Sequence, residues 1–227
     1  MTFLNKKTTQ TFLGLGISIL LTNCSALDSS KIAPGYKETY LAMRNAIFGF
    51  PELEISPETI QNIPYASMLL QIGKGPNGLV ILERKRGQQY VWVSADEIYL
   101  VLKKGKIVET RGLSNNLIDT FQSSLPFKEI IGGEVKELQG YYSYDNPPLR
   151  NLSLNFEYKV IGKELVQILG SSKELLRIEE KGISDILGWK FTNIYWVDEN
   201  YLVWKSSQTL SPKLPKINYT VTKKPSI

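Results

Sequence analysis

Hydrophobic and polar residues alternate over residues 152–160, and this alternation constrains the fold more than any other feature of the chain. The apolar positions are Leu152, Leu154, Phe156, Tyr158 and Val160, and the polar residues between them are Ser153, Asn155, Glu157 and Lys159. Successive side chains of a β-strand point to opposite faces, so a strand with one buried face shows a period of two. The segment therefore predicts a strand with one face against a core and the other in water.

The same period of two recurs in short stretches along most of the chain. These stretches are 67–72, 79–85, 88–94, 97–103, 106–110, 165–169, 175–180, 191–197, 201–208 and 217–222. Turn residues separate many of them, as at Arg86-Gly87, Lys104-Gly105 and Asp198-Glu199-Asn200, and breaks this short are typical of hairpins. We therefore expect a mainly β fold, with antiparallel strands in a curved sheet, a sandwich or a partly closed barrel.

Helical signals are confined to the start and the middle of the chain. Apolar residues at spacings of four, three and four predict a short N-terminal helix, and they are Tyr36, Tyr40, Met43 and Ile47. Ser56 followed by Pro57 has the pattern of an N-cap and a first helical residue, which predicts a short helical turn. Residues 114–140 are less regular, and we expect a short helix with loops there.

The first 24 residues have the anatomy of a bacterial export signal. Lys6 and Lys7 precede an apolar stretch over 12–21, about half the roughly 20 residues that span a bilayer. Cys24, the only cysteine, follows and resembles the lipobox cysteine of bacterial lipoproteins. In that class the thiol receives a diacylglyceryl group, the signal is cut before the cysteine, and the new amine is acylated, typically with palmitate. The alternatives are a signal anchor, or a secreted protein with a chance cysteine.

These features predict the organisation of the whole chain. We expect a signal peptide over 1–23, a lipidated tether over 24–34, and a single β-rich periplasmic domain over 35–227. Ser25 follows the cysteine, whereas an aspartate there tends to retain enterobacterial lipoproteins in the inner membrane. The resemblance to lipoproteins therefore implies a lipid anchor in the outer membrane, with the domain facing the periplasm.

Composition excludes several classes of site. The 227-residue chain has no histidine and one cysteine, which removes Ser-His-Asp and Cys-His nucleophile systems, imidazole metal sites, Cys-cluster zinc sites and intrachain disulfides. Its 27 basic and 22 acidic residues give a formal charge of +5 without a block of like charges, whereas a nucleic-acid binder concentrates its positive charge. We expect no metal, no cofactor and no nucleic-acid partner.

Two segments together resemble a known family. The first segment begins with Tyr90-Val91-Trp92-Val93-Ser94-Ala95-Asp96, continues through Gly105-Lys106-Ile107 and ends with Thr110-Arg111-Gly112-Leu113. The second segment begins with Asn193-Ile194-Tyr195-Trp196-Val197-Asp198, continues through Val203-Trp204-Lys205-Ser206-Ser207-Gln208 and ends with Pro212 and Pro215. Their order and spacing resemble the group 4 capsule polysaccharide lipoproteins of the YjbF/GfcB type, from about Ile60 to the end. Glu97 stands where that family usually has a glycine, and Asn200-Tyr201 where it often has Thr-Gly.

The resemblance implies a periplasm-facing outer-membrane lipoprotein encoded among exopolysaccharide or capsule secretion functions. Exopolysaccharide secretion proteins, the polysaccharide, or both are the implied partners, and the membrane is reached through the N-terminal lipid. The family supplies no catalytic residue that can be carried over to this chain.

Five residues are candidates for contact with a polysaccharide or a partner. Trp92, Trp196 and Trp204 can stack on sugar rings, and the alternative is that they fill the core of the β domain. Asp96 and Asp198, each followed by a glutamate, can coordinate a cation or act in acid–base chemistry. The alternative for both is turn chemistry, in which the aspartate stabilises a bend through nearby backbone.

Three lysines, Lys103, Lys104 and Lys106, cluster on one predicted hairpin. They can meet an anionic polysaccharide or lipid head groups, or they can form a solvated edge that discourages strand addition.

Three functions remain open. The first is a non-enzymatic accessory lipoprotein of exopolysaccharide or capsule export that binds partner proteins or the polymer. The second is a periplasmic carrier that encloses an apolar ligand, such as a lipid, in a curved sheet. The third is a polysaccharide-modifying enzyme that works through carboxylates, although no two carboxylates are paired by the sequence.

Overall fold

The computed structural model describes residues 56–121 and 126–225. The predicted signal peptide, the tether with Cys24 and the helix predicted over 36–47 lie outside these residues. The described elements are α3 (Pro57–Asn62), β1 (Ser67–Ile72), β2 (Asn77–Arg86), β3 (Gln89–Ser94), β4 (Tyr99–Lys103), β5 (Lys106–Arg111), β6 (Leu117–Thr120), α4 (Phe127–Ile131), β7 (Glu137–Tyr144), β8 (Leu149–Ile168), β9 (Ser171–Ser184), β10 (Trp189–Val197), β11 (Val203–Gln208) and β12 (Ile217–Lys223).

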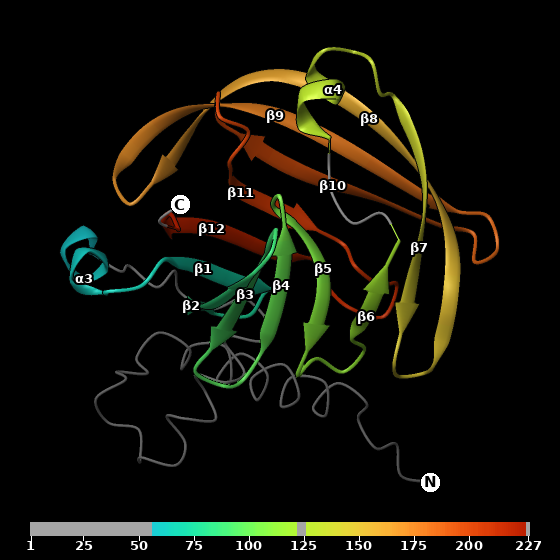
Figure 1. Cartoon of the computed structure of the whole chain (residues 1–227), viewed down its shortest axis with the longest axis horizontal. Coiled ribbons are helices and arrows are strands. Elements are labelled where there is room, and N and C mark those ends of the chain that lie inside the picture. The colour runs from blue at the N-terminus through green and yellow to red at the C-terminus, as the bar shows by residue number, and fades with distance from the viewer. Residues whose placement is uncertain (1–55, 122–125, 226–227) are drawn as a thin grey trace, which may run out of the picture. The chain divides into compact units, whose positions relative to one another are not determined.

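The twelve described strands form one antiparallel sheet, which confirms the expected fold class. Neighbours in the sheet follow the order β5-β4-β3-β2-β1-β12-β11-β10-β9-β8-β7-β6. Each strand therefore pairs with its neighbour in sequence, except that the first strand lies beside the last (Figure 1). This pairing joins the two halves of the chain into a continuous sheet, and its edges, β5 and β6, fall in mid-chain.

The two edge strands come close together and nearly close the sheet into a barrel. No backbone ladder links them in the described residues, and the side chain of Thr110 bridges the gap instead. Its hydroxyl accepts a hydrogen bond from the backbone N–H of Leu117 at 3.0 Å. We call this junction the β5–β6 seam.

Both short helices expected in the described residues are present, and the capping signal of the first is confirmed. The Ser56 hydroxyl accepts a hydrogen bond from the backbone N–H of Thr59 at 3.1 Å, and Pro57 begins α3. The helix expected within 114–140 is α4, and it lies between two strands, β6 and β7, which the irregular pattern there did not reveal.

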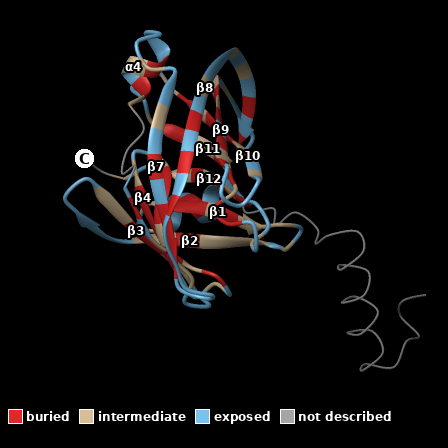
Figure 2. Cartoon of the chain, turned by 90° about the vertical axis from the view of Figure 1, so that its right-hand side faces the viewer, coloured by how far each residue is buried: buried red, intermediate tan, exposed pale blue. Residues whose placement is uncertain are grey.

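The strand with the clearest alternation is longer than predicted. β8 runs for 20 residues and merges the two stretches expected over 152–160 and 165–169, with Gly162 at φ +144° beside a register shift where the strand bends. Figure 2 shows buried and exposed residues alternating along it. β8 and β9 form a long hairpin that arches over the remaining strands (Figure 1).

The core fills the inside of the curved sheet with large side chains from both halves of the chain. Its fully buried members include Met68, Leu100, Leu154, Phe156 and Tyr195. A second, smaller cluster of Val91, Val101 and Val108, with Tyr99 packed against it, collects residues from β3, β4 and β5. On these three strands, buried valines therefore alternate with core residues such as Trp92 and Leu100.

Two tight turns hold non-glycine residues in the left-handed region. Glu97 has φ +61° in the turn between β3 and β4, and Tyr201 has φ +63° in the turn between β10 and β11. These are the positions at which the family resemblance leads one to expect glycine. The left-handed region explains that preference, because only glycine enters it without steric cost.

Candidate functional site

A buried ion pair occupies the middle of the core. Lys106 Nζ lies 3.0 Å from Glu180 Oε2, and both side chains are 0% exposed. The expectation that Lys106 belongs to a solvated edge, or meets an anionic polymer or lipid, is therefore wrong. Lys106 points inward from β5, across the core to β9, while Lys104 remains exposed and Lys103 is half-buried.

The carboxylate of Glu180 is held by a set of donors that leaves neither oxygen unpaired. Oε2 also accepts a hydrogen bond from the Tyr158 hydroxyl at 2.9 Å, and Oε1 accepts from Asn193 Nδ2 at 2.7 Å and from the Tyr195 hydroxyl at 3.2 Å. Lys106 Nζ also lies 4.2 Å from the ring centroid of Phe156, a cation–π distance. Charge, hydrogen bonds and an aromatic face together offset the removal of both ions from water.

Burial sets the protonation behaviour of this interior. It lowers the pKa of Lys106 below the usual value for lysine, and the nearby Glu180 carboxylate partly opposes this shift. Burial also raises the pKa of the Tyr142 and Tyr195 hydroxyls well above the usual value, with the negative charge of Glu180 adding to the shift. Ionising either tyrosine would place a second anion in the core.

The turn before Lys106 packs against β11 and β12. The Gln208 amide accepts from the backbone N–H of Ile107 at 3.0 Å and donates to the carbonyl of Gly105 at 2.9 Å, and this carbonyl also accepts from the Tyr219 hydroxyl at 2.6 Å. A Cβ on Gly105 would lie 2.2 Å from Val203 Cγ2, so only glycine fits. The two segments that carry the family resemblance therefore meet inside the sheet.

Trp92 and Asp96 lie apart from the other three candidate residues. Trp92 is 3% exposed within the main core cluster, and it presents no face for stacking on a sugar. Asp96 is exposed in the turn after β3, where its carboxylate accepts a hydrogen bond from the Ser94 hydroxyl. This is the geometry of a turn, and no second carboxylate is bonded to it in the described residues.

The structure brings Trp196, Asp198 and Trp204 together on the outer side of the β10–β11 hairpin. Asp198 Oδ1 accepts from the backbone N–H groups of Asn200 and Leu202, and its Oδ2 accepts from Trp204 Nε1, each at 2.9 Å. Both indoles are half-buried against a small cluster formed by Val166, Ile168 and Leu175 from the β8–β9 hairpin. The sequence did not show that this hairpin would cover them.

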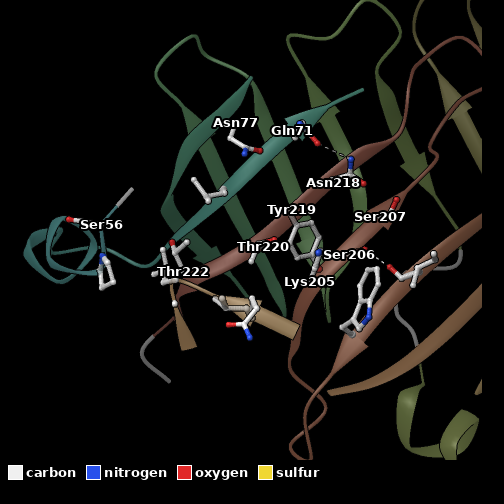
Figure 3. Close-up of a pocket in the computed structure, with 18 residues that line it drawn as sticks. Ser56, Gln71, Asn77, Lys205, Ser206, Ser207, Asn218, Tyr219, Thr220 and Thr222 are labelled. Atoms are coloured by element: carbon white, nitrogen blue, oxygen red, sulfur yellow. Dashed lines mark hydrogen bonds between the residues drawn. The ribbon is translucent and has the colours of Figure 1, made fainter. Parts of the chain in front are cut away.

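An open groove of about 800 Å³ lies beside these tryptophans. Its floor is the outer face of β1, β12, β11 and β10 with the start of β2 at Asn77. Its walls include the tip of the β8–β9 hairpin at Ile168, Leu169 and Gly170 and the start of α3 at Ser56 and Pro57. Figure 3 shows this region, with the polar side chains of the floor drawn as sticks. The volume is within the range of small-molecule sites, roughly 300–1,000 Å³.

The strand register places the floor residues in two parallel rows. Cross-strand partners form the first, which we call the amide row: Asn77, Gln71, Asn218 and Ser207 (Figure 3). Partners two residues along each strand form the second, the tryptophan row: Leu69, Thr220, Lys205 and Trp196. Residues directly opposite each other, and residues two apart, share one face of a sheet.

The indole of Trp196 is fixed at the end of its row. Its Nε1 donates to Glu164 Oε2 at 2.8 Å, and Lys205 Nζ lies 5.3 Å from its ring centroid. The second oxygen of Glu164 accepts from Arg177 Nη1 at 2.9 Å. These hydrogen bonds hold the pKa of Glu164 below its usual range. The carboxylate is therefore ionised and already paired.

Sequence reasoning missed the amide row because it depends on strand order. Asn218 and Ser207 each lie between two buried residues, and Gln71 follows one, so their outward direction can be read from the alternation along each strand. The pattern does not show that β1 lies beside β12, and without that pairing the three residues are scattered over 147 positions.

Neither a cluster of metal ligands nor a membrane-spanning helix occurs in the described residues. Over 56–121 and 126–225, no three histidine, cysteine, aspartate or glutamate side chains are grouped so that they could hold a metal ion. None of the helices in these ranges has the length and apolar character needed to cross a membrane.

Comparison with known proteins gives a consistent set of relatives. Residues 40–221 match the family model described as group 4 capsule polysaccharide lipoprotein gfcB, YjbF. The chain is 27% identical over 213 residues to the uncharacterized lipoprotein YjbF of Escherichia coli (strain K12), covering 91% of this chain and 94% of YjbF. It is 26% identical over 159 residues to the uncharacterized lipoprotein GfcB of the same organism, covering 68% of this chain and 74% of GfcB.

A solved structure shares the fold. The crystal structure of the hypothetical lipoprotein YmcC from Escherichia coli (K12) superimposes with a TM-score of 0.69 at 23% sequence identity, covering 82% of this chain and 96% of YmcC. The family model spans most of the β domain, including both segments that build the buried Lys106–Glu180 surroundings. The chain belongs to the YjbF family of group 4 capsule polysaccharide lipoproteins.

Proposed function

We propose that this protein is an accessory lipoprotein of exopolysaccharide or capsule production or export, anchored in the outer membrane by lipidated Cys24. The β domain faces the periplasm and acts by binding the polymer or partner proteins rather than by catalysis. The observation that carries this proposal is the family match over residues 40–221. The outer groove, with its rows of amide and hydroxyl side chains, supports a binding role.

The bonding of the candidate carboxylates supports the non-enzymatic part of the proposal. Asp198 is engaged by two backbone N–H groups and one indole, and Asp96 by the Ser94 hydroxyl. Glycoside hydrolysis uses two carboxyl groups that face one another across the scissile bond, about 5–9.5 Å apart. These two lie in different turns, each stabilising its own bend.

The packed interior argues against the alternative of a carrier for apolar ligands. The inside of the sheet is filled by the core and by the Lys106–Glu180 pair. A lipid in that position would have to displace large aromatic side chains and a buried ion pair.

Deletion and complementation of the gene test the proposal. We expect the deletion strain to lose surface polysaccharide, and the wild-type gene to restore it. Cys24→Ser is expected to fail to restore it and to move the protein from the membrane fraction to the soluble one. Asp96→Asn combined with Asp198→Asn is the matched control, which should restore secretion fully. Normal secretion by the deletion strain would overturn the proposed function, and failure of the aspartate control would overturn its non-enzymatic part.

A further inference from the structure

The groove floor has the hydrogen-bonding chemistry of a surface for sugars. Amide side chains offer both donors and acceptors, and hydroxyl groups do the same, so together they match the hydroxyl groups of a carbohydrate. Within the described part of the chain, the side chains of Asn77, Ser207 and Thr220 make no hydrogen bond. They are half-buried and open to the groove, so their bonding capacity is available to a ligand.

The two rows also fit an extended chain rather than a compact ligand. Adjacent strands lie about 4.8 Å apart, so the four strands of the amide row span roughly 14 Å. The two rows are separated by two residues along each strand, about 6.7 Å. The floor is therefore a shallow strip, walled on one side by the tip of the β8–β9 hairpin.

One charge distinguishes this strip from a neutral surface. Lys205 is the single charged side chain among the described residues that line the groove, and no acidic residue lines it. Lys205 lies within the tryptophan row, between Thr220 and Trp196. Lys205 is close enough to Glu164 to help lower its pKa, but the hydrogen bonds to both oxygens of that carboxylate come from Arg177 and Trp196. Among the described residues Lys205 forms no ion pair within 4.0 Å, so its ammonium group can serve a ligand anion.

We propose that the groove binds a segment of an acidic polysaccharide, with a sugar carboxylate on Lys205 and the sugar hydroxyls on the amide row. The inference rests on the proposed function and names the class of polymer that the site takes. The half-buried indole of Trp196 lies at the end of the strip, packed on the β8–β9 hairpin and with Lys205 over its ring, so the part of the indole left exposed can contact the sugar next to the one bound by Lys205.

Calorimetric titration of the full-length protein in detergent tests this assignment. The probe is an oligogalacturonate, and the comparison ligand is the same oligomer with its carboxylates methyl-esterified, which keeps the rings and hydroxyls and removes the charge. We expect the acidic oligomer to bind at least about ten-fold more tightly than the ester, since a charge-assisted hydrogen bond contributes about that factor. Added salt should weaken the binding of the acidic oligomer and leave the binding of the ester unchanged.

Variants locate the binding in the groove. Lys205→Gln removes the charge, so we expect it to weaken binding of the acidic oligomer by about ten-fold or more and to leave binding of the ester unaffected. Asn218→Ala should weaken both ligands by about two- to ten-fold, the loss of one neutral hydrogen bond. Lys85→Gln is the matched control, because Lys85 also lies over an aromatic ring, 5.6 Å from the centroid of Tyr90, outside the groove. Equal urea midpoints would show that all variants are folded.

The outcomes separate this inference from the proposed function. Equal binding of acid and ester, unchanged binding by Lys205→Gln, or no binding by the wild type would each overturn the acidic-glycan site. If the deletion strain still loses surface polysaccharide in those cases, the proposed function stands. If instead the groove binds the acidic oligomer but deletion leaves secretion unchanged, the site stands and the proposed function fails.

Discussion

Removing one member of the buried ion pair should destabilise the fold more than any exposed charge change. Lys106→Met leaves the Glu180 carboxylate fully buried with three neutral donors, from Tyr158, Asn193 and Tyr195, and no cation. Breaking a buried pair from one side costs about 3–5 kcal/mol of unfolding free energy. For a chain of this size, that loss lowers the thermal midpoint by about 6–20 °C.

The double variant separates charge from shape. Lys106→Met combined with Glu180→Gln removes both charges and keeps the volume, and the new amide oxygen still accepts from Asn193 and Tyr195. Because no uncompensated charge remains, we expect the double variant to lose less stability than either single variant. The coupling between the two substitutions should therefore be at least about 3 kcal/mol.

Urea denaturation of the purified protein, followed by tryptophan fluorescence and circular dichroism, measures these differences. The control is Lys163→Met, which breaks an ion pair with Glu174 that is shorter, at 2.7 Å, but more than half exposed on both sides. We expect no change in its midpoint, since water replaces the lost contact. Equal losses for Lys106→Met and Lys163→Met, or a double variant that loses the sum of the two single losses, would refute the reasoning.

Three further expectations concern alkaline pH and backbone geometry. Burial raises the pKa of the Tyr142, Tyr144, Tyr195 and Tyr219 hydroxyls, so the folded state keeps up to four protons that the unfolded chain releases near pH 10. The stability that these groups contribute is complete below pH 10 and should fall above it by up to about 5 kcal/mol per pH unit, measured by urea denaturation across that range. Glu97→Gly and Tyr201→Gly, at φ +61° and +63°, should each raise the unfolding free energy by about 0.5–1 kcal/mol. Gly105→Ala should lower it by about 2–5 kcal/mol, because strain at φ +81° adds to the clash with the β11 side chain.

Two controls accompany the glycine substitutions. Gly87→Ala has the same kind of positive φ, +59°, but an added Cβ would meet nothing within 4 Å. It isolates the backbone cost, so a loss equal to that of Gly105→Ala would contradict the packing argument. Ala95→Gly, in the same turn as Glu97 but without a positive φ, should not stabilise. A gain there as large as that of Glu97→Gly would contradict the conformational argument.

Local pattern predicted ten of the twelve described strands, all but β6 and β7, because the period of two is a local property. The predicted stretch 67–72 matches β1 at both ends, and the Ser56 cap and Pro57 start of α3 are also as expected. The pattern failed at Gly162, where the bend within β8 looked like the end of one strand and the start of another. A bulge changes the side-chain alternation without ending the hydrogen-bonded ladder.

Long-range features lay beyond the sequence pattern. Lys106 begins its strand beside a turn, as a solvated lysine would, and only the position of Glu180 on β9 makes its burial favourable. Asp96 and Asp198 stabilise turns through groups close to them in sequence. Local reasoning was therefore enough to name this role as the alternative to a binding or catalytic one. The groove required the register between β1 and β12, which no local period contains.

The neighbouring positions of the first and last strands have a consequence for how the chain is made. Ser67 and Thr222 share a hydrogen bond across 155 positions, so β1 is synthesised long before the strand with which it pairs. Until Ile217–Lys223 has emerged, β1 and β11 each present an open edge, the kind of surface that recruits other chains into aggregates. A product truncated before Ile217 would lack β12, so both edges would stay open and the product would be prone to aggregation.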